Sequence, residues 1–301
     1  MEATELRNRL AGVIAFPITP FKKDLALDLQ GLRHNLTELV QHPICAVVAA
    51  GGTGEMYSLT ADEHLQVIKT TVEIVEGRVP VIAGVGFGHQ LAVQLAQAAA
   101  AAGSQGILAF PPYYPQADDA GLLEYYRQIG RATSLGMFIY SRDWAAFSPP
   151  MVERLTSIPT LIAWKDGQGD IRRLLAIMNR LGNRLHWIGG AGDDMVPAYY
   201  AIGIRTYTSS IATVAPRLSL KLHELASAGR DDELMELMRK CVVPLYAIRA
   251  RRKGYEVSTM KAMMDMAGLS GGPVRPPLVN VNADEKEELR AILEQWQPFL
   301  D

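Results

Sequence analysis

The sequence predicts an α/β protein with a (βα)8 fold, the TIM barrel, followed by a C-terminal extension of three helices. Eight short apolar, β-branched runs recur along the chain, and each is followed by a glycine-rich or polar corner and then an amphipathic stretch. The ends of successive runs lie about 19 to 34 residues apart, which is the length of a βα unit. Eight such units favour a closed barrel, because an open doubly wound sheet usually has fewer strands.

The expected strands are continuously apolar more often than alternating, as in parallel strands that are buried on both faces. In chain order the expected strands are Gly12–Phe16, Ala46–Ala50, Val81–Gly84, Ile107–Phe110, Met137–Tyr140, Leu161–Lys165, His186–Gly189 and Ile204–Thr208.

The helices between these strands have recognisable starts. Thr60 followed by Glu63 forms a capping box. Ser148 precedes two prolines, which the first turn of a helix tolerates, and Asp170 precedes another apolar-periodic stretch.

The eighth helix is expected to end near Gly229, so we expect a barrel at 1–229 and a C-terminal helical region at 230–301. The segment 271–277 is rich in glycine and proline and interrupts this region, since it cannot continue a helix. The helices expected in the region are Asp231–Arg252, Tyr255–Gly268 and Ala283–Trp296.

Composition excludes several classes of protein. The 301 residues are 49% hydrophobic and 21% charged, with a net charge of −2, so no basic excess supports nucleic acid or an anionic membrane as a partner. The apolar runs are shorter than the roughly 20 residues of a membrane span, and the acidic N-terminus is unlike a signal peptide. We therefore expect a cytoplasmic enzyme.

The sequence predicts no metal and no organic cofactor. The two cysteines are too few for a cysteine-rich zinc site, and the histidines show no paired ligand spacing. Asp193 and Asp194 could bind a divalent cation, but a helix cap is the favoured interpretation. The run 84–88 lacks the last glycine of a dinucleotide fingerprint, because residue 89 is His.

Active sites of this fold lie at the C-terminal ends of the strands. Lys165 ends the sixth strand, where desolvation can lower the pKa of the amine and make it a nucleophile. Tyr140 ends the fifth strand and could relay protons to a carbonyl substrate. The alternatives are that Lys165 is a loop lysine paired with Asp166, and that Tyr140 is a core tyrosine with a solvated hydroxyl.

Two loops complete the candidate site. The run 51–55, GGTGE, follows the second strand, and its backbone N–H groups and the Thr53 hydroxyl could bind a carboxylate. As a bare pattern, it is also an ordinary βα turn. Tyr113 and Tyr114 follow two prolines after the fourth strand, and could line a pocket or pack against another subunit.

The sequence resembles the dihydrodipicolinate synthase/N-acetylneuraminate lyase family in four features taken together: GGTGE, PPYYP, the tyrosine that ends the fifth strand and the lysine in WKDGQGD. The resemblance extends over essentially the whole chain. It implies a (βα)8 class I aldolase, usually a homotetramer, with no cofactor beyond a Schiff base. By position, Lys165 would form that Schiff base with a 2-oxo acid, Tyr140 would move protons, and Gly52 with Thr53 would bind the carboxylate.

Within the family, the chain is most similar to the 5-dehydro-4-deoxyglucarate dehydratase subgroup, through AGGTGE, the Arg142-Asp143 pair, KDGQGD, Ser209-Ser210 and GPVRPPL. The synthase branch has a threonine where this chain has Gly52, which relays protons with a tyrosine like Tyr114. Synthase chemistry is therefore disfavoured. The subgroup dehydrates and decarboxylates a 2-oxo sugar acid to 2,5-dioxopentanoate.

The resemblance and simple chemistry give the remaining substrate contacts. A guanidinium can bind a carboxylate bidentately, so Arg142 is expected to hold the distal carboxylate. Ser209 is expected to bind the hydroxyls or assist elimination, and Gly190 and Tyr114 to contact the substrate.

Three other functions stay open. The loops after Tyr140, Gly190 and Ser210 depart from the subgroup pattern, so a retro-aldolase or dehydratase acting on another 2-oxo sugar acid is the first alternative. A barrel that binds a 2-oxo acid as a sensor, without turnover, is the second. A metal-dependent aldolase is weakened because the sequence has no cluster of metal ligands.

Overall fold

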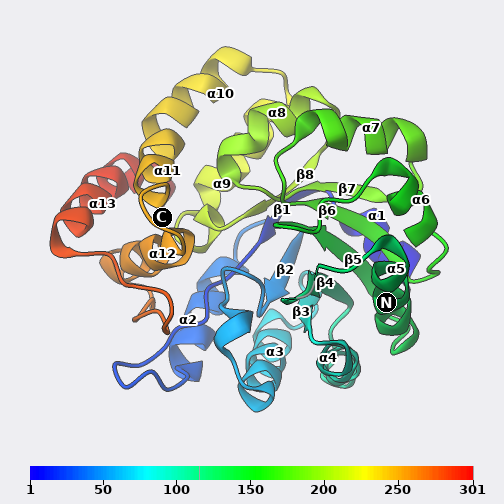
Figure 1. The fold of residues 1–301 in the computed structure, drawn as a ribbon. Coiled ribbons are helices and arrows are strands. Elements are labelled where there is room, and N and C mark those ends of the chain that lie inside the picture. Colours follow the sequence, from blue (N-terminus) through cyan, green and yellow to red (C-terminus); the bar gives the residue numbers. More distant parts are fainter. Residues whose placement is uncertain (115, 301) are drawn as a thin grey trace.

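Eight parallel strands close into a barrel in the computed structural model, which describes residues 1–114 and 116–300 (Figure 1). Pro115, the last residue of the PPYYP motif, and Asp301 lie outside the described residues. The predicted fold class is confirmed. The strands are β1 (Gly12–Ala15), β2 (Ala46–Ala49), β3 (Val81–Phe87), β4 (Gly106–Pro112), β5 (Gly136–Ser141), β6 (Leu161–Asp166), β7 (His186–Gly189) and β8 (Thr206–Ser209).

Helices surround the barrel on its outside, and each of α2 to α9 lies in the connection that follows a strand (Figure 1). The capping box predicted at Thr60 and Glu63 is present, and Ser148 and Asp170 cap the helices that they were predicted to start. The helices of the barrel are α2 (Leu29–Leu39), α3 (Ala61–Val75), α4 (His89–Ala101), α5 (Asp119–Arg131), α6 (Pro149–Leu155), α7 (Ile171–Leu181), α8 (Val196–Ala201) and α9 (Pro216–Ser227).

A helix that the sequence did not predict, α1 (Ala3–Arg9), precedes the first strand and packs against β5 and β6. Its Leu6 is fully buried. A Cβ placed on Gly106 or Gly136, at the N-terminal ends of β4 and β5, would lie 2.7 or 3.2 Å from the Leu6 side chain. Leu6 therefore packs against the N-terminal end of the barrel, opposite the strand ends where the site was predicted.

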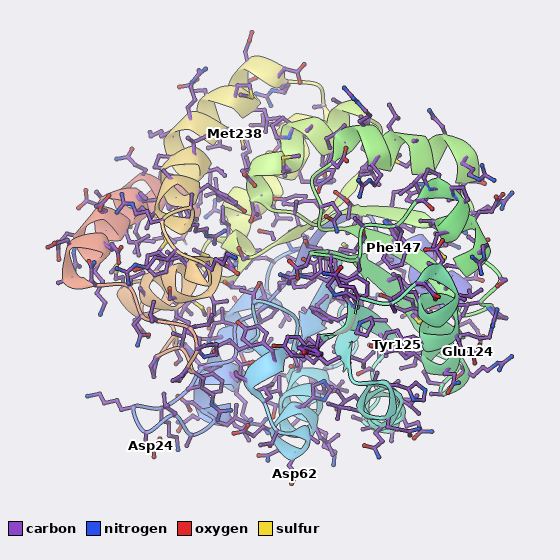
Figure 2. All side chains as sticks on the ribbon, in the orientation of Figure 1. Asp24, Asp62, Glu124, Tyr125, Phe147 and Met238 are labelled. Carbon is purple, nitrogen blue, oxygen red and sulfur yellow. The ribbon has the colours of Figure 1, made fainter. Side chains whose placement is uncertain are left out.

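The C-terminal extension packs on one side of the barrel, against α8 and α9 (Figure 1). Side chains fill the space between its helices and those of the barrel, whereas charged groups such as Asp24 and Asp62 point outwards (Figure 2). The extension consists of α10 (Asp231–Leu237), α11 (Val243–Arg249), α12 (Tyr255–Met266) and α13 (Ala283–Trp296). A domain boundary near Gly229, between α9 and α10, stays a prediction.

The single helix predicted over 231–252 is wrong in detail. A π-helical turn at Met238–Val242 separates α10 from α11, and Pro244 follows it. Proline has no N–H group to bond the carbonyl four residues earlier, so the helix widens before it. Among the described residues, no helix is long and apolar enough to cross a membrane.

Strand register brings the candidate residues together. β5 pairs with β6 so that Tyr140 lies beside Lys165, and β6 pairs with β7 so that Lys165 lies beside Ile188. In a barrel with this register, Tyr140 and Lys165 occupy neighbouring strands at the same height. The fold alone therefore predicts a contact between their side chains.

Candidate active site

A cavity of about 1010 Å³ opens at the C-terminal ends of the strands. All eight residues predicted for the site line it: Gly52, Thr53, Tyr114, Tyr140, Arg142, Lys165, Gly190 and Ser209.

The amine of Lys165 is buried at the base of this cavity, with 3% of the residue exposed. Its Nζ donates a hydrogen bond of 3.0 Å to the Gly190 carbonyl and lies 3.2 Å from the centre of the Tyr140 ring. The alternative pairing with Asp166 is absent. The Asp166 carboxylate instead accepts hydrogen bonds from the Tyr199 hydroxyl, at 2.8 Å, and from two loop N–H groups.

This environment favours the neutral amine. Burial lowers the pKa of Lys165 well below its ordinary value, the Arg142 cation lowers it further, and Asp166 opposes the shift. A lysine can attack a carbonyl only when it is unprotonated, so the site prepares Lys165 for that chemistry.

Tyr140 lies directly against the amine. Its hydroxyl donates a long hydrogen bond of 3.5 Å to the Gly190 carbonyl, and Phe110 packs edge-on against its ring at 5.3 Å. Burial raises the pKa of the phenol, while Arg142, whose guanidinium carbon lies 5.4 Å from the ring centre, opposes that shift. The phenol is therefore protonated at neutral pH and can act as an acid.

Gly190 leaves no room for a side chain. A Cβ at this position would lie 2.5 Å from Cγ and 2.7 Å from Nζ of Lys165, and 2.8 Å from the Asp166 carbonyl. Its carbonyl also accepts the hydrogen bonds of both Lys165 and Tyr140. Gly190 thus sets the position of the amine through its backbone.

The glycine-rich run forms a tight turn after β2. The Glu55 N–H bonds the Gly52 carbonyl at 3.1 Å, and the Met56 N–H bonds the Gly51 carbonyl at 3.2 Å. Gly52 and Thr53 line the cavity, and within the described part of the chain no acceptor bonds their N–H groups. These groups are able to bind an anion.

Arg142 lies on the same side of the cavity as this turn. A Cβ on Gly52 would lie 3.4 Å from Nη1 of Arg142, which shows how close the guanidinium is to the turn. Its Nε forms a 2.7 Å ion pair with Asp143, and about a third of the Arg142 side chain is exposed. A partly exposed cation beside the turn is placed to attract an anionic substrate.

Ser209 lies at the end of β8, and its hydroxyl is already bonded to protein. It donates to the Asp193 carboxylate, shares a 2.8 Å hydrogen bond with Ser219 and accepts one of 2.9 Å from the Ala212 N–H. Substrate binding by this hydroxyl stays a prediction. In the structure, Ser209 holds Asp193.

Tyr114 stands at the mouth of the cavity, 89% exposed and with a positive φ of 74°. Its neighbour Tyr113 is also exposed. The structure therefore brings Tyr114 to the rim of the cavity and not into contact with Lys165.

Two further residues belong to the site: Asp193, for which the sequence favoured a helix cap, and Arg249, which the sequence did not identify. Asp193 is buried behind Ser209. Burial raises the pKa of its carboxyl to about 6, although the hydrogen bond from Ser209 acts in the opposite direction and lowers that pKa. Arg249 of α11 lines the cavity, with Nη2 bonded to Ser210 at 3.0 Å and its guanidinium carbon 4.8 Å from the Tyr246 ring. In the sequence Arg249 belongs to the basic run RARRK, which is typical of a solvated helix end.

The described residues contain no group of three or more His, Cys, Asp or Glu side chains that could hold a metal ion. Asp193 is bonded to Ser209 and Tyr246, so the predicted helix cap is wrong for this residue, and its carboxylate instead joins β8 to α11.

A barrel with a buried lysine at a strand end, in one cavity with a glycine-rich turn, is typical of aldolase-like lyases. The Dihydrodipicolinate synthetase family model matches residues 9–296. The chain belongs to this family, and it is an enzyme of the lyase class. The resemblance inferred from the motifs is thereby confirmed.

Several relatives share most of their length with the chain. The "Probable 5-dehydro-4-deoxyglucarate dehydratase" of Methylobacterium radiotolerans is 39% identical over 286 residues, 94% of either chain. The protein of the same name from Ralstonia nicotianae is 38% identical and covers 94% of this chain and 92% of its own. The crystal structure of dihydrodipicolinate synthase from Oceanobacillus iheyensis superposes with a TM-score of 0.92, at 30% identity over 99% of this chain and 100% of that one.

Proposed function

We propose that this enzyme is a 5-dehydro-4-deoxyglucarate dehydratase that works through a Schiff base on Lys165. The observation that carries the proposal is the buried amine, 3.2 Å from the Tyr140 ring and aimed into a cavity with free N–H groups at Gly52 and Thr53. The relatives named as probable dehydratases of this substrate support the choice of substrate.

The first step forms the iminium. The neutral amine of Lys165 attacks the ketone carbon, and the ketone oxygen leaves as water with one proton from the amine and one from the Tyr140 phenol. The Arg142 cation stabilises the phenolate that results. The turn holds the carboxylate next to the ketone through the Gly52 and Thr53 N–H groups.

The second step expels the β-hydroxyl. The phenolate takes a proton from the methylene carbon beside the iminium, which gives a neutral enamine. The enamine electrons expel the hydroxyl on the next carbon, and Tyr140 returns the proton so that the hydroxyl leaves as water. A carbon–carbon double bond conjugated with the iminium is formed.

The third step releases CO₂. The bond to the distal carboxylate breaks, its electrons move through the conjugated system to the iminium nitrogen, and protonation and hydrolysis return Lys165 and release 2,5-dioxopentanoate. One water is consumed and two are released, so the net products are 2,5-dioxopentanoate, CO₂ and one water, with one proton taken from solvent. No metal or organic cofactor enters these steps.

Two measurements test the function together. The wild-type enzyme should release CO₂ from 5-dehydro-4-deoxyglucarate, and cyanoborohydride with pyruvate should leave a stable adduct on Lys165, located by mass spectrometry. An adduct without CO₂ release but with retro-aldol products would indicate another 2-oxo sugar acid. Binding with no product of any kind would indicate a sensor.

Replacing Tyr140 with phenylalanine is expected to lower kcat for CO₂ release by about 10² to 10⁴-fold, because the proton relay is lost. The ring against Lys165 is retained, so the pyruvate adduct should still form, but more slowly, because the phenol also supplies a proton when the iminium forms. Tyr125→Phe, on the outer helix α5, is the matched control and should keep wild-type kcat. Wild-type kcat in Tyr140→Phe would remove Tyr140 from the mechanism.

Replacing Arg142 with glutamine is expected to shift the pH dependence of labelling at Lys165. Arg142 lowers the pKa of Lys165, so its loss raises that pKa and leaves less neutral amine at a given pH. Labelling of Lys165 by acetone is measured between about pH 6 and 10. The pH at which labelling rises should be higher in Arg142→Gln than in the wild type. Arg154→Gln removes a surface cation and should leave the curve in place; an unmoved or lowered curve for Arg142→Gln contradicts the assignment.

The oligomeric state belongs to the same proposal. Tyr113 and Tyr114 are exposed side by side, and an exposed aromatic pair at a cavity mouth favours a partner surface. We propose a homo-oligomer with these tyrosines at a subunit interface. Light scattering of the wild type and of a Tyr113→Ser/Tyr114→Ser variant tests it: a monomeric wild type would refute it.

A further inference from the structure

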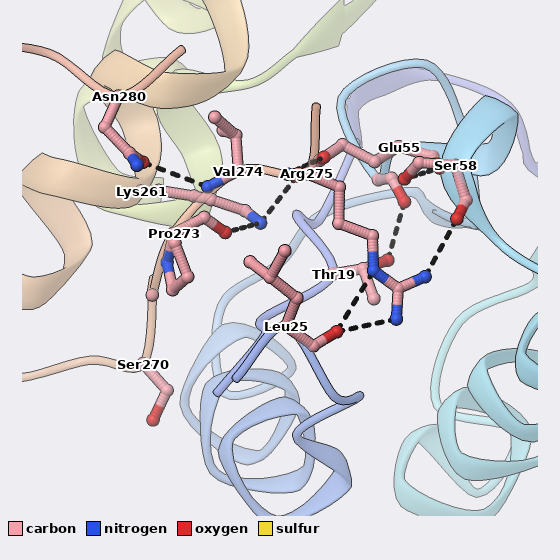
Figure 3. A network of polar contacts seen from close by, with 12 residues as sticks. Thr19, Leu25, Glu55, Ser58, Lys261, Ser270, Pro273, Val274, Arg275 and Asn280 are labelled. Carbon is pink, nitrogen blue, oxygen red and sulfur yellow. Dashed lines mark hydrogen bonds and ion pairs between the residues drawn. The ribbon is translucent and has the colours of Figure 1, made fainter. Parts of the chain in front are cut away.

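A buried ion pair joins the C-terminal extension to the glycine-rich turn. Nζ of Lys261, on α12, lies 2.5 Å from Oε1 of Glu55, and the two side chains are 1% and 0% exposed. Lys261 also donates a 2.8 Å hydrogen bond to the Pro273 carbonyl, so the lysine links the turn to the segment that follows α12 (Figure 3). Glu55 is the last residue of the GGTGE run, three residues after Gly52.

Glu55 is held in a conformation that its residue type does not favour. Its φ of 52° places it in the left-handed region, where a residue with a side chain is unfavourable. Its second oxygen accepts a 3.0 Å hydrogen bond from the Arg275 N–H, and the Thr19 hydroxyl holds the preceding Gly54 carbonyl at 2.7 Å. The backbone of the turn is therefore fixed by groups from outside it.

A second cation from the extension holds the segment that follows the turn. The Arg275 guanidinium donates to both oxygens of Glu63, at 2.7 and 2.5 Å. It also donates to the carbonyls of Ser58 and Leu25, at 2.8 Å each (Figure 3). The Phe21 ring lies 4.1 Å from this guanidinium and 4.1 Å from the Lys261 amine. Both cations thus contact the same stretch of barrel loops.

A buried ion pair is a poor source of stability. Desolvation of the two charges offsets much of their attraction, and apolar residues of similar size often stabilise a core as well. What the Lys261–Glu55 ion pair provides is position, since the two charges must stay close together. The Arg275–Glu63 pair, which has two hydrogen bonds, also fixes an angle. Here these constraints act on a turn whose residues Gly52 and Thr53 line the cavity.

We propose that Lys261 and Arg275 are positioning residues for the carboxylate site: through Glu55 and Glu63 they hold the Gly52 and Thr53 N–H groups where they bind the carboxylate of a 2-oxo acid. The inference rests on the proposed function of that turn. It makes the C-terminal extension part of substrate recognition, although neither cation lines the cavity.

The test compares two ketones, one with a carboxylate and one without. Cyanoborohydride labelling of Lys165 is followed by mass spectrometry at increasing concentrations of pyruvate and, separately, of acetone. In Lys261→Met and in Arg275→Gln, the half-saturating concentration of pyruvate is expected to rise at least about 10-fold, the loss of roughly one well-placed charge-assisted contact. The rate of acetone labelling should equal that of the wild type, because acetone has no carboxylate to bind.

Two further variants complete the design. Glu55→Gln/Lys261→Met removes both charges, so it leaves no unpaired buried carboxylate. If Lys261→Met does not fold, this double variant is used in its place. Arg251→Gln removes a surface ion pair with Glu288 in the same extension and serves as the matched control, with wild-type values for both ketones. The double variant should show the same selective loss of pyruvate affinity as Lys261→Met.

The outcomes separate this inference from the proposed function. Unlabelled wild-type Lys165 would refute the Schiff base itself. The positioning role would be overturned if wild-type Lys165 is labelled and the folded variants show an unchanged half-saturating concentration of pyruvate. Equal losses with pyruvate and acetone would also overturn it, since they would show general damage to the barrel.

Discussion

Lys165→Ala is expected to lower CO₂ release from 5-dehydro-4-deoxyglucarate by at least about 10⁴-fold and to abolish the pyruvate adduct. The variant removes the nucleophile, and no neighbouring group replaces it in covalent catalysis. The fold should survive, because the buried amine is bonded to a single carbonyl, that of Gly190. Circular dichroism and a kinetic assay of the purified variant measure both effects.

Lys69→Ala is the matched control for this variant, because it removes an exposed lysine from α3. It should retain wild-type turnover and an adduct on Lys165. Full activity in Lys165→Ala, or an adduct that appears on another lysine, would contradict the mechanism.

Gly190→Ala is expected to lower kcat by about 10²-fold or more, because the added methyl group would lie 2.5 to 2.7 Å from the Lys165 side chain and displace the amine. The displacement also breaks the hydrogen bond to the Gly190 carbonyl. Adduct formation with pyruvate should slow in parallel with turnover, which a stopped-time labelling assay measures.

Gly121→Ala separates the steric effect from a general effect of alanine. Gly121 lies in α5, and a Cβ there would be 3.5 Å from its nearest neighbour, an ordinary contact. Alanine also favours a helix over glycine, so this variant should be active and slightly more stable. Wild-type turnover in Gly190→Ala would show that Lys165 does not need its observed position.

Much of the fold could be predicted because a barrel repeats one local pattern. Strand ends such as Tyr140, Lys165 and Gly189 were within a residue or two of those observed, since each apolar run stops at a polar or glycine corner. The extensions of β3 and β4 to Phe87 and Pro112 were missed. Their last residues pair with each other, a contact that depends on the closed barrel.

The parts that could not be predicted depend on distant contacts. α1 is short and weakly patterned, and its burial depends on Leu6 packing on strands more than a hundred residues away. The predicted helix does continue past Pro244, but the sequence pattern did not reveal the π-helical turn before the proline.

The candidate site divides in the same way. Lys165, Tyr140 and the glycine-rich turn could be located because they occupy strand ends, and the strand ends of this fold meet at one face. Arg249 could not be located, because α11 reaches the cavity only through the packing of the extension. The hydrogen bond from Ser209 to Asp193 could not be predicted either, because the two residues are 16 positions apart, one at the end of β8 and the other after β7.

The wall that the extension contributes to the cavity has an evolutionary consequence. Arg249, Lys253, Glu256 and Leu278 face the cavity from a part of the chain that carries none of the strand ends. Substitutions there can change the shape and charge around the far end of a substrate while the strand ends stay intact. A mutant library confined to these four positions is therefore a direct route to variants that accept a different acid.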